Sequence, residues 1–342
     1  MVDYSMVAQL LRSKLPDQSE IELHLFEFCN LKCYFCGQDH DDKSGMDLIS
    51  AKIPLIQNFI KNNPQKNHIL NIMGGEIFND QIEDHLFEEY CKLAIDVNEY
   101  AKSIGHNCHF NWVTNLVFKK RDRVINFLDK LKAQGISTKL STSYDFTGRK
   151  NKTWIEDLFK ANIDYFFKDI YTVGFVLSKP AIQFLLYDHD EYFDYLYKNF
   201  PLYFDFYVPE AGAKQLMPSD EDLLMAYRFI AATYPKVSPV KELLENSVNK
   251  MTCYSLNKLT LLPDNKEVKC RYLKYKDDDF QNPVDYMSND NIIYSYIEEN
   301  QCLSCPHYDR CSFRCFVQAD WAKREKATSC VFKTFFDEKG FA

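Results

Sequence analysis

Three cysteines within eight residues carry the clearest chemistry in this chain. Cys29, Cys33 and Cys36 have the spacing C-x-x-x-C-x-x-C and follow a strand-like run over residues 21–28. Thiolates at this spacing on one short loop can bind three irons of a cubic 4Fe–4S cluster, which leaves the fourth iron without a protein ligand. An open metal position is typical of a catalytic site, because structural sites fill every position.

A structural zinc loop is the alternative for these cysteines, with His40 as a fourth ligand. A second array of cysteines near the C-terminus helps to decide between these alternatives. Its core has the spacing C-x2-C-x5-C-x3-C. The array consists of Cys253, Cys270, Cys302, Cys305, Cys311, Cys315 and Cys330. Taken alone it also fits a small zinc knot. Together, the two arrays favour iron–sulfur clusters.

Composition narrows the class of protein. The 342 residues are 46% hydrophobic, enough for a large domain and a smaller one. A net charge of −8 argues against a nucleic-acid partner. We see neither a secretory signal nor a run of about eighteen apolar residues, so we expect no membrane span and a cytoplasmic location. In that compartment, twelve cysteines indicate metal ligation rather than disulfides.

Strand-like and helix-like segments alternate over the first 240 residues. The expected strands cover residues 21–28, 69–73, 109–113, 136–143, 165–177 and 202–208. The expected helices cover about 50–62, 82–101, 124–131, 152–162, 181–199 and 219–234. Gly105 and Gly135 mark helix ends, and Ser219 with Asp222 forms a capping box. Six such β-then-α units predict a parallel α/β sheet that closes part of a TIM-like (β/α)8 barrel.

Short motifs follow the expected strands, where the loops of such a barrel carry the chemistry. Met73-Gly74-Gly75-Glu76 follows the second strand, Thr114-Asn115 the third and Ser143-Tyr144-Asp145 the fourth. In this order, and together with the cysteine triad, they resemble the motifs of the radical S-adenosylmethionine (radical SAM) superfamily. The resemblance covers residues 20–335 and implies that SAM chelates the open iron and yields a 5′-deoxyadenosyl radical, which takes a hydrogen atom from the substrate.

The resemblance also implies which residues contact SAM. In the family's glycine–glycine–glutamate segment, the glycines admit the SAM amino group and the glutamate holds a neighbouring polar group. Leu116 departs from the family pattern, which has Gly after Thr-Asn. The expected SAM contacts are Phe35, Gly74, Gly75, Glu76, Asn115, Ser143, Arg149 and Val208.

The C-terminal array resembles the SPASM domain, an extension that holds two auxiliary 4Fe–4S clusters. The resemblance assigns Cys302, Cys305, Cys311 and Cys330 to the outer cluster and Cys253, Cys270 and Cys315 to the inner one. The inner cluster is thus one thiolate short, so either another residue completes it or one iron stays open. Asn265 replaces a family Gly in the turn of a hairpin expected over residues 259–270, and Asn tolerates the left-handed backbone.

Two cysteines fall outside both arrays. Cys91 lies in an expected helix and Cys108 beside an expected strand, so we expect ordinary buried thiols, with a hydrogen-atom donor as the alternative. The chain accordingly divides into a partial barrel over residues 1–240 and a SPASM domain over residues 241–342. The expected cofactors are SAM and three 4Fe–4S clusters.

The resemblance to radical SAM and SPASM proteins indicates the class of reaction more clearly than it indicates the substrate. SPASM enzymes include anaerobic sulfatase-maturating enzymes and maturases of ribosomally made peptides, so the leading interpretation is an oxidoreductase acting on a peptide or protein. Such an enzyme would crosslink, oxidise or epimerise its substrate, with flavodoxin or ferredoxin as electron donor. One alternative is a small-molecule substrate such as a sugar, nucleoside or amino acid. The other is a zinc-binding protein without catalysis.

Overall fold

A computed structural model describes most of the chain. It covers residues 18–33, 36–144, 153–188, 191–208, 214–247, 258–268, 297–311, 315, 318 and 330–341. In these parts, no helix is both long enough and apolar enough to span a membrane.

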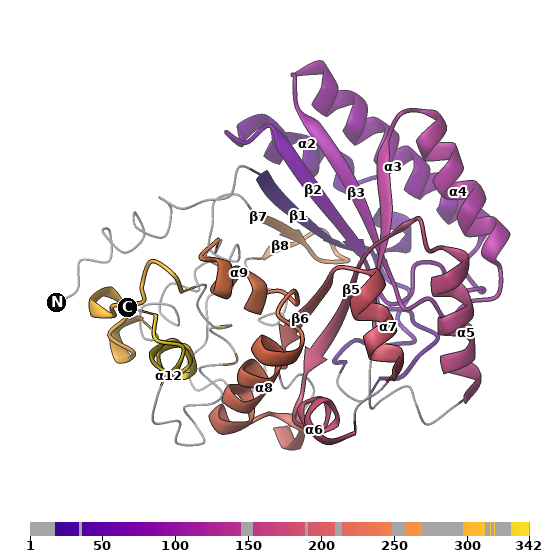
Figure 1. Ribbon diagram of the computed structural model, residues 1–342. Coiled ribbons are helices and arrows are strands. Elements are labelled where there is room, and N and C mark those ends of the chain that lie inside the picture. Colours follow the sequence, from indigo (N-terminus) through magenta and orange to yellow (C-terminus); the bar gives the residue numbers. More distant parts are fainter. Residues whose placement is uncertain are drawn as a thin grey trace.

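One mixed sheet organises the molecule and curls into a partial barrel (Figure 1). Its strand order is β6-β5-β4-β3-β2-β1-β7-β8, parallel from β6 to β7, with β8 antiparallel to β7. The strands are β1 (Gln18–His24), β2 (Asn67–Met73), β3 (Asn107–Thr114), β4 (Ser137–Ser143), β5 (Ile170–Leu177), β6 (Leu202–Phe206), β7 (Lys258–Leu261) and β8 (Glu267–Val268). The six β-then-α units and the parallel sheet agree with the expected fold class.

Helices connect the strands and cover the outer side of the sheet, with α2 to α5 following one another along it (Figure 1). The helices are α2 (Lys52–Asn62), α3 (Asp84–Ser103), α4 (Arg121–Ala133), α5 (Thr153–Tyr165), α6 (Lys179–Tyr187), α7 (Glu191–Asn199), α8 (Asp220–Thr233), α9 (Val240–Glu245) and α12 (Val331–Glu338). Short 3-10 turns are η1 (Met46–Leu48), η3 (Lys214–Leu216) and η6 (Cys302–Ser304). Near the C-terminus, α12 packs against α8.

The two faces of the sheet differ in character because side chains alternate along each strand. On the outer face, Trp112 of β3 contacts Tyr90 of α3 and Phe127 of α4, with ring centroids 5.8 and 4.8 Å away. Leu23 and Leu70 join the same buried cluster. The opposite face, which we call the inner face, is largely polar.

Several local expectations are confirmed. Gly105 and Gly135 end α3 and α4 with left-handed backbones, at φ angles of 77° and 67°. Ser219 and Asp222 form the capping box that begins α8. Asn265 adopts the left-handed backbone expected at its turn, with φ 64°.

Two expected boundaries were wrong. The strand expected from residue 165 begins at Ile170, because α5 runs to Tyr165 and the Phe166 N–H still donates to the Asn162 carbonyl at 2.9 Å. The single helix expected over residues 181–199 is two helices, α6 and α7. The backbone N–H of Asp188 bonds the Phe184 carbonyl and ends α6.

The hairpin of β7 and β8 belongs to the barrel sheet, since β7 pairs in parallel with β1. A lysine from α2 fixes its turn. Lys52 is fully buried, and its Nζ donates to the Leu262 carbonyl at 2.6 Å and to Asn265 Oδ1 at 2.7 Å. Burial lowers the pKa of Lys52 to about 8. A helix of the first barrel unit is therefore bonded to the turn between β7 and β8.

Candidate functional site

The loops after β1, β2 and β3 meet at one edge of the sheet, because parallel strands place their carboxyl ends together. The first loop carries the cysteine triad, the second Gly74 to Glu76 and the third Thr114 to Val117. Backbone bonds join the first two: the Gly75 N–H donates to the Phe26 carbonyl at 2.8 Å, and the Glu76 N–H to the Phe28 carbonyl at 2.9 Å.

The two glycines are required by this close approach. A Cβ at Gly75 would lie 2.0 Å from the carbonyl oxygen of Phe28, and one at Gly74 would lie 2.8 Å from that of Phe26. Both distances are shorter than any real Cβ contact, and backbone atoms cannot rotate away as a side chain can. The pair therefore lets the second loop pack directly on the backbone that leads to Cys29.

Glu76 joins the second loop to the third. It is fully buried, and its Oε1 accepts bonds from the Thr114 hydroxyl at 2.7 Å and from the Phe78 N–H at 3.0 Å. Its Oε2 accepts the Asn115 N–H at 2.5 Å. Hydrogen bonds to a carboxylate are roughly twice as strong as neutral ones, so this side chain holds the Thr114–Asn115 turn firmly.

Asn115 completes the link back to the cysteine loop. Its Nδ2 donates to Asn30 Oδ1 at 2.9 Å and lies 3.8 Å from Cys29 Sγ. Asn30 in turn donates to the Val117 carbonyl at 2.5 Å. The three loops thus form one hydrogen-bonded unit around Cys29.

Leu116 occupies the position where the family pattern has Gly. Its backbone is left-handed, with φ 56°, and its side chain is fully buried. The Leu116 N–H donates to the Thr114 hydroxyl at 3.1 Å. The turn therefore has the conformation that glycine favours, and the strain of a leucine there is offset by burial of its side chain.

The cysteine triad is unbridged and lies near acidic charge. Burial raises the pKa of Cys29 to about 12, and the Glu76 carboxylate and the neighbouring Cys33 and Cys36 act in the same direction. Burial therefore disfavours the thiolate form of Cys29. Nearby, the Cys36 thiol contacts Gln38 Oε1 at 3.4 Å, and Gln38 Nε2 donates to the Gly74 carbonyl at 3.0 Å.

The other expected SAM contacts are placed only in part. Ser143 ends β4, and Val208 follows β6 and is buried. Phe35 and Arg149 lie outside the described residues.

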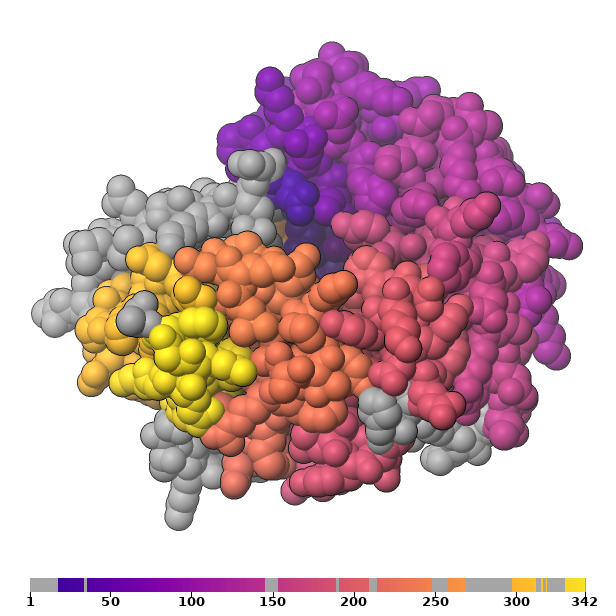
Figure 2. Space-filling model, viewed as in Figure 1, coloured from indigo at the N-terminus to yellow at the C-terminus, as the bar shows by residue number. Residues whose placement is uncertain are grey.

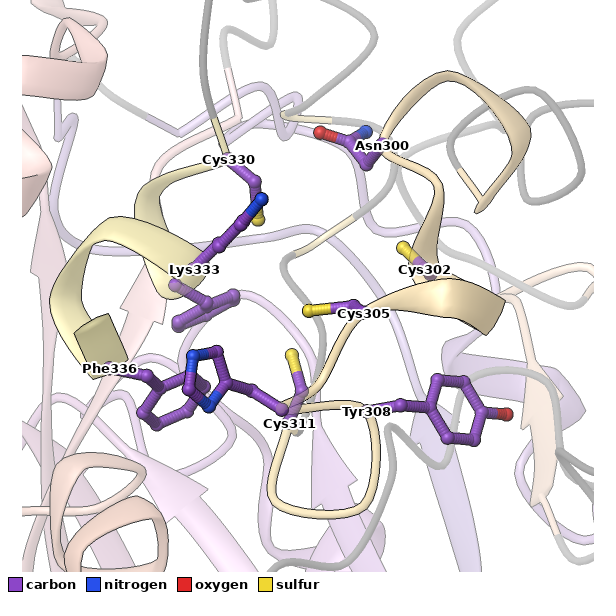
Figure 3. A pocket seen from close by; sticks show the side chains of 10 residues that line it. Asn300, Cys302, Cys305, Tyr308, Cys311, Cys330, Lys333 and Phe336 are labelled. Carbon is purple, nitrogen blue, oxygen red and sulfur yellow. The ribbon is translucent and has the colours of Figure 1, made fainter. Parts of the chain in front are cut away.

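A second group of cysteines lines a pocket near the C-terminus (Figure 3). The sulfur atoms of Cys302, Cys305 and Cys311 point toward the space that separates η6 from α12. Cys330 stands across that space, at the N-cap of α12. These are the four residues that the resemblance assigns to the outer cluster. In the described parts of the chain, no group of three or more Cys, His, Asp or Glu side chains is placed to hold a metal ion without rearrangement.

The remaining cysteines are not part of that group. Cys315 does not line the pocket, and Cys253 and Cys270 of the expected inner cluster lie outside the described residues. Cys91 in α3 and Cys108 in β3 are buried, as expected for ordinary thiols.

Sequence reasoning missed the polar residues that connect the loops. Asn30 and Gln38 lie beside the triad, but neither belongs to a motif. Its position directly after Cys29, within the cysteine triad, was the available signal for Asn30. Nothing in the sequence singled out Gln38, because its partner is a backbone carbonyl of a loop far along the chain.

Comparison with solved structures identifies the fold. A native anSMEcpe structure with bound AdoMet and the Cp18Cys peptide matches with a TM-score of 0.62 at 14% identity, over 94% of this chain and 96% of that one. anSMEcpe is an anaerobic sulfatase-maturating radical SAM enzyme with a SPASM domain. The chain has the radical SAM and SPASM fold.

Two further anSMEcpe structures show the same fold. The native protein with bound AdoMet has a TM-score of 0.61 at 14% identity, and a polyhistidine-tagged form with bound AdoMet has 0.59 at 12%. Each match covers 94% of this chain and 96% of the other. No protein-family model matches the sequence, and no curated protein matches it.

Proposed function

We propose that this protein is a radical SAM enzyme that takes a hydrogen atom from a peptide or protein substrate. The observation that carries the proposal is the bonded unit of three loops around Cys29. Each of these loops contains a motif that the sequence shares with radical SAM enzymes, and Glu76 and Asn115 bond them into one site.

The residues present fit a 4Fe–4S cluster with one open iron. Cys29, Cys33 and Cys36 supply three thiolates from one loop, and no fourth cysteine lies on that loop. A bound cation would favour the thiolate of Cys29, which burial otherwise disfavours. With SAM on the open iron, such a cluster supplies a 5′-deoxyadenosyl radical.

The chain's own residues would hold and orient SAM. Gly74 and Gly75 let the second loop pack against the backbone that leads to Cys29, and Glu76 fixes the turn that presents Asn115 beside Cys29. Ser143 ends β4, and Val208 follows β6. We include the remaining predicted contacts, Phe35 and Arg149, in this site.

We further propose two auxiliary 4Fe–4S clusters. The pocket lined by Cys302, Cys305, Cys311 and Cys330 has the four thiols that a fully ligated cluster needs. Cys253, Cys270 and Cys315 would hold the inner cluster. An enzyme that oxidises its substrate needs an electron acceptor nearby, and these clusters would serve, with flavodoxin or ferredoxin as the external partner.

The proposed substrate class is a peptide or protein. The bound peptide in the similar anSMEcpe structure supports this choice, because the two chains share their fold over nearly their whole length. Crosslinking, oxidation and epimerisation are all reactions that this chemistry permits.

The test is to purify the protein without oxygen, count its irons and supply SAM and dithionite. We expect on the order of twelve irons per chain and formation of 5′-deoxyadenosine. Replacing Cys29, Cys33 and Cys36 with Ala should abolish 5′-deoxyadenosine and leave about two thirds of the iron. The matched control is the Cys91→Ala, Cys108→Ala variant, which should keep both. A zinc-loaded protein that does not cleave SAM would overturn the proposal.

A further inference from the structure

A histidine lies among the cysteines that line the pocket between η6 and α12. The side chain of His307 lines this pocket together with Cys302, Cys305, Cys311 and Cys330. His307 follows Cys305 by two positions, and only 4% of its side chain is exposed. No motif in the sequence includes this histidine, and the proposed function gives it no role.

The carboxylate of Asp337 determines which nitrogen of the imidazole is available. His307 Nε2 lies 2.7 Å from Asp337 Oδ1. An ionised carboxylate only accepts hydrogen bonds, so Nε2 carries a proton and donates it. The lone pair of the neutral imidazole is then on Nδ1. Histidines that bind metals almost always donate their other ring N–H to such a partner, so this pair has the arrangement of a metal ligand and its support.

Nδ1 of His307 has no hydrogen-bond partner in the part of the chain that the structure describes. The ring is held in place by Phe336, whose ring centroid lies 5.2 Å away and whose side chain is fully buried. Both Phe336 and Asp337 belong to α12, which packs against α8. A fixed imidazole therefore lines the pocket, with one nitrogen that no described group uses.

The pocket offers five metal donors, one more than a 4Fe–4S cluster needs. Such a cluster has four irons, each with one position for a protein ligand. The sulfur atoms of Cys302, Cys305 and Cys311 point toward the pocket (Figure 3). His307 belongs to the same segment, whereas Cys330 stands across the pocket at the N-cap of α12. The fourth position can thus be filled from either side.

The donors must move to meet on one centre. In the described residues, no group of three or more Cys, His, Asp or Glu side chains is placed to hold a metal ion. Turns already draw one side together, since the Cys305 N–H donates to the Cys302 carbonyl at 3.1 Å. The Cys311 N–H likewise donates to the His307 carbonyl at 3.0 Å. Figure 2 shows residues 297–311 in gold beside α12 in yellow at the surface of the molecule. Closing the pocket on a metal is therefore a change in these two surface segments, and metal binding is commonly coupled to such local folding.

We propose that His307 Nδ1 and the Cys330 thiolate are alternative ligands of one iron in the cluster of this pocket. The other three cysteines bind the remaining irons, so the cluster keeps four ligands when Cys330 leaves it. Asp337 is a positioning residue, because its carboxylate occupies Nε2 and leaves Nδ1 for the iron. The inference rests on the proposed function, which assigns a 4Fe–4S cluster to this pocket.

The two ligands differ in charge, which gives the exchange a measurable consequence. A thiolate is an anion, whereas a neutral imidazole carries no charge. A cluster with imidazole in place of one thiolate is less negative and therefore easier to reduce, as in clusters where histidine replaces cysteine. Exchange from Cys330 to His307 should thus raise the reduction potential of this cluster.

The test uses the full chain, purified without oxygen and without SAM, whose amino group would add a nitrogen signal. Cys330→Ala removes a thiol but no capping bond, because the Cys330 side chain makes none at the start of α12. In this variant we expect pulsed electron paramagnetic resonance of the reduced clusters to show a nitrogen coupling from an iron-bound imidazole. We also expect a reduction potential above that of the parent. Cys330→Val, which keeps an apolar contact with the core, should give the same results.

A double variant shows whether His307 is the source of the nitrogen. In Cys330→Ala with His307→Gln, the new amide keeps an N–H for Asp337 but lacks the ring nitrogen, so the nitrogen coupling should disappear. The matched control is Cys330→Ala with His85→Gln, because His85 is an exposed histidine on α3. This control should keep the coupling.

Asp337→Asn tests the positioning role through the release of iron to a chelator. With Cys330→Ala it should speed this release about 10–100-fold, since loss of such a partner lowers metal affinity by that factor. With Cys330 intact it should leave the rate unchanged, whereas a merely structural role would affect both proteins alike.

The inference would be overturned if Cys330→Ala showed no nitrogen coupling, if the double variant kept the coupling, or if the reduction potential did not change. Equal effects of Asp337→Asn with and without Cys330 would also overturn it. A parent without any 4Fe–4S cluster would instead overturn the proposed function, on which the inference rests.

Discussion

Asn265 offers a direct test of how the turn between β7 and β8 is fixed. The family pattern that this segment resembles has Gly at this position, and the φ angle of 64° is one that Gly adopts without strain. Asn265→Gly removes about 1 kcal/mol or less of backbone strain, because Asn tolerates this conformation. It also removes the Oδ1 atom that lies 2.7 Å from the buried Lys52 ammonium. A hydrogen bond to a charged group contributes about 1.5–3 kcal/mol, so the loss outweighs the gain.

We therefore expect Asn265→Gly to lower the free energy of unfolding by about 1–2 kcal/mol. Urea unfolding followed by circular dichroism measures it, and Lys52→Met with the double variant should show a coupling of similar size. Asn246→Gly is the matched control, because Asn246 has φ 55°, is exposed and lies outside this contact. A variant at least as stable as the parent would refute the argument that the Lys52 bond, rather than the backbone, selects Asn265.

Two further predictions concern stability. Leu116→Gly removes roughly 1–2 kcal/mol of backbone strain at φ 56°, but it also deletes a fully buried side chain that contributes about 2–5 kcal/mol. We therefore expect the variant to be less stable than the parent in the same urea assay. A more stable variant would show that the backbone strain dominates at this position. The ring of His68 is hydrogen-bonded to the Ser19 hydroxyl at 2.5 Å and to the His106 ring at 2.9 Å. Burial, together with the nearby His106, lowers the pKa of His68 to about 4. Since the unfolded chain has a histidine pKa near 6.5, the folded state binds fewer protons between these values, and its stability should fall by about 2–3 kcal/mol from pH 6.5 to pH 4. His68→Gln should remove most of that slope, and an unchanged slope would assign it to other groups.

Local signals in the sequence predicted the order of the elements and several of their ends. The capping box at Ser219 and the stops at Gly105 and Gly135 depend on neighbouring residues alone, so they could be inferred without the fold. The boundary at residue 165 could not, because the aromatic run there fits a strand and a helix equally well. Packing against the rest of the chain decides such cases.

The site was predictable as a set of motifs but not as a connected structure. The triad and Glu76 were identified from the sequence, whereas the bond between Asn30 and Asn115 joins residues 85 positions apart. The ion pair between Glu22 of β1 and Lys258 of β7 joins strands that are even more distant in sequence. Such contacts depend on which strands are neighbours. The low identity to anSMEcpe, 14%, shows how few positions this fold constrains.

The pairing of β7 with β1 has a consequence for how the chain can be divided. A cut near residue 240 would remove β7 and leave the peptide groups along one side of β1 unpaired, a template for aggregation. It would also remove the Leu262 carbonyl and the Asn265 Oδ1, which accept hydrogen bonds from the Lys52 ammonium. The strands β7 and β8, which follow residue 240, thus fold as part of the barrel sheet, and a boundary at that residue would separate β1 from a strand that it pairs with.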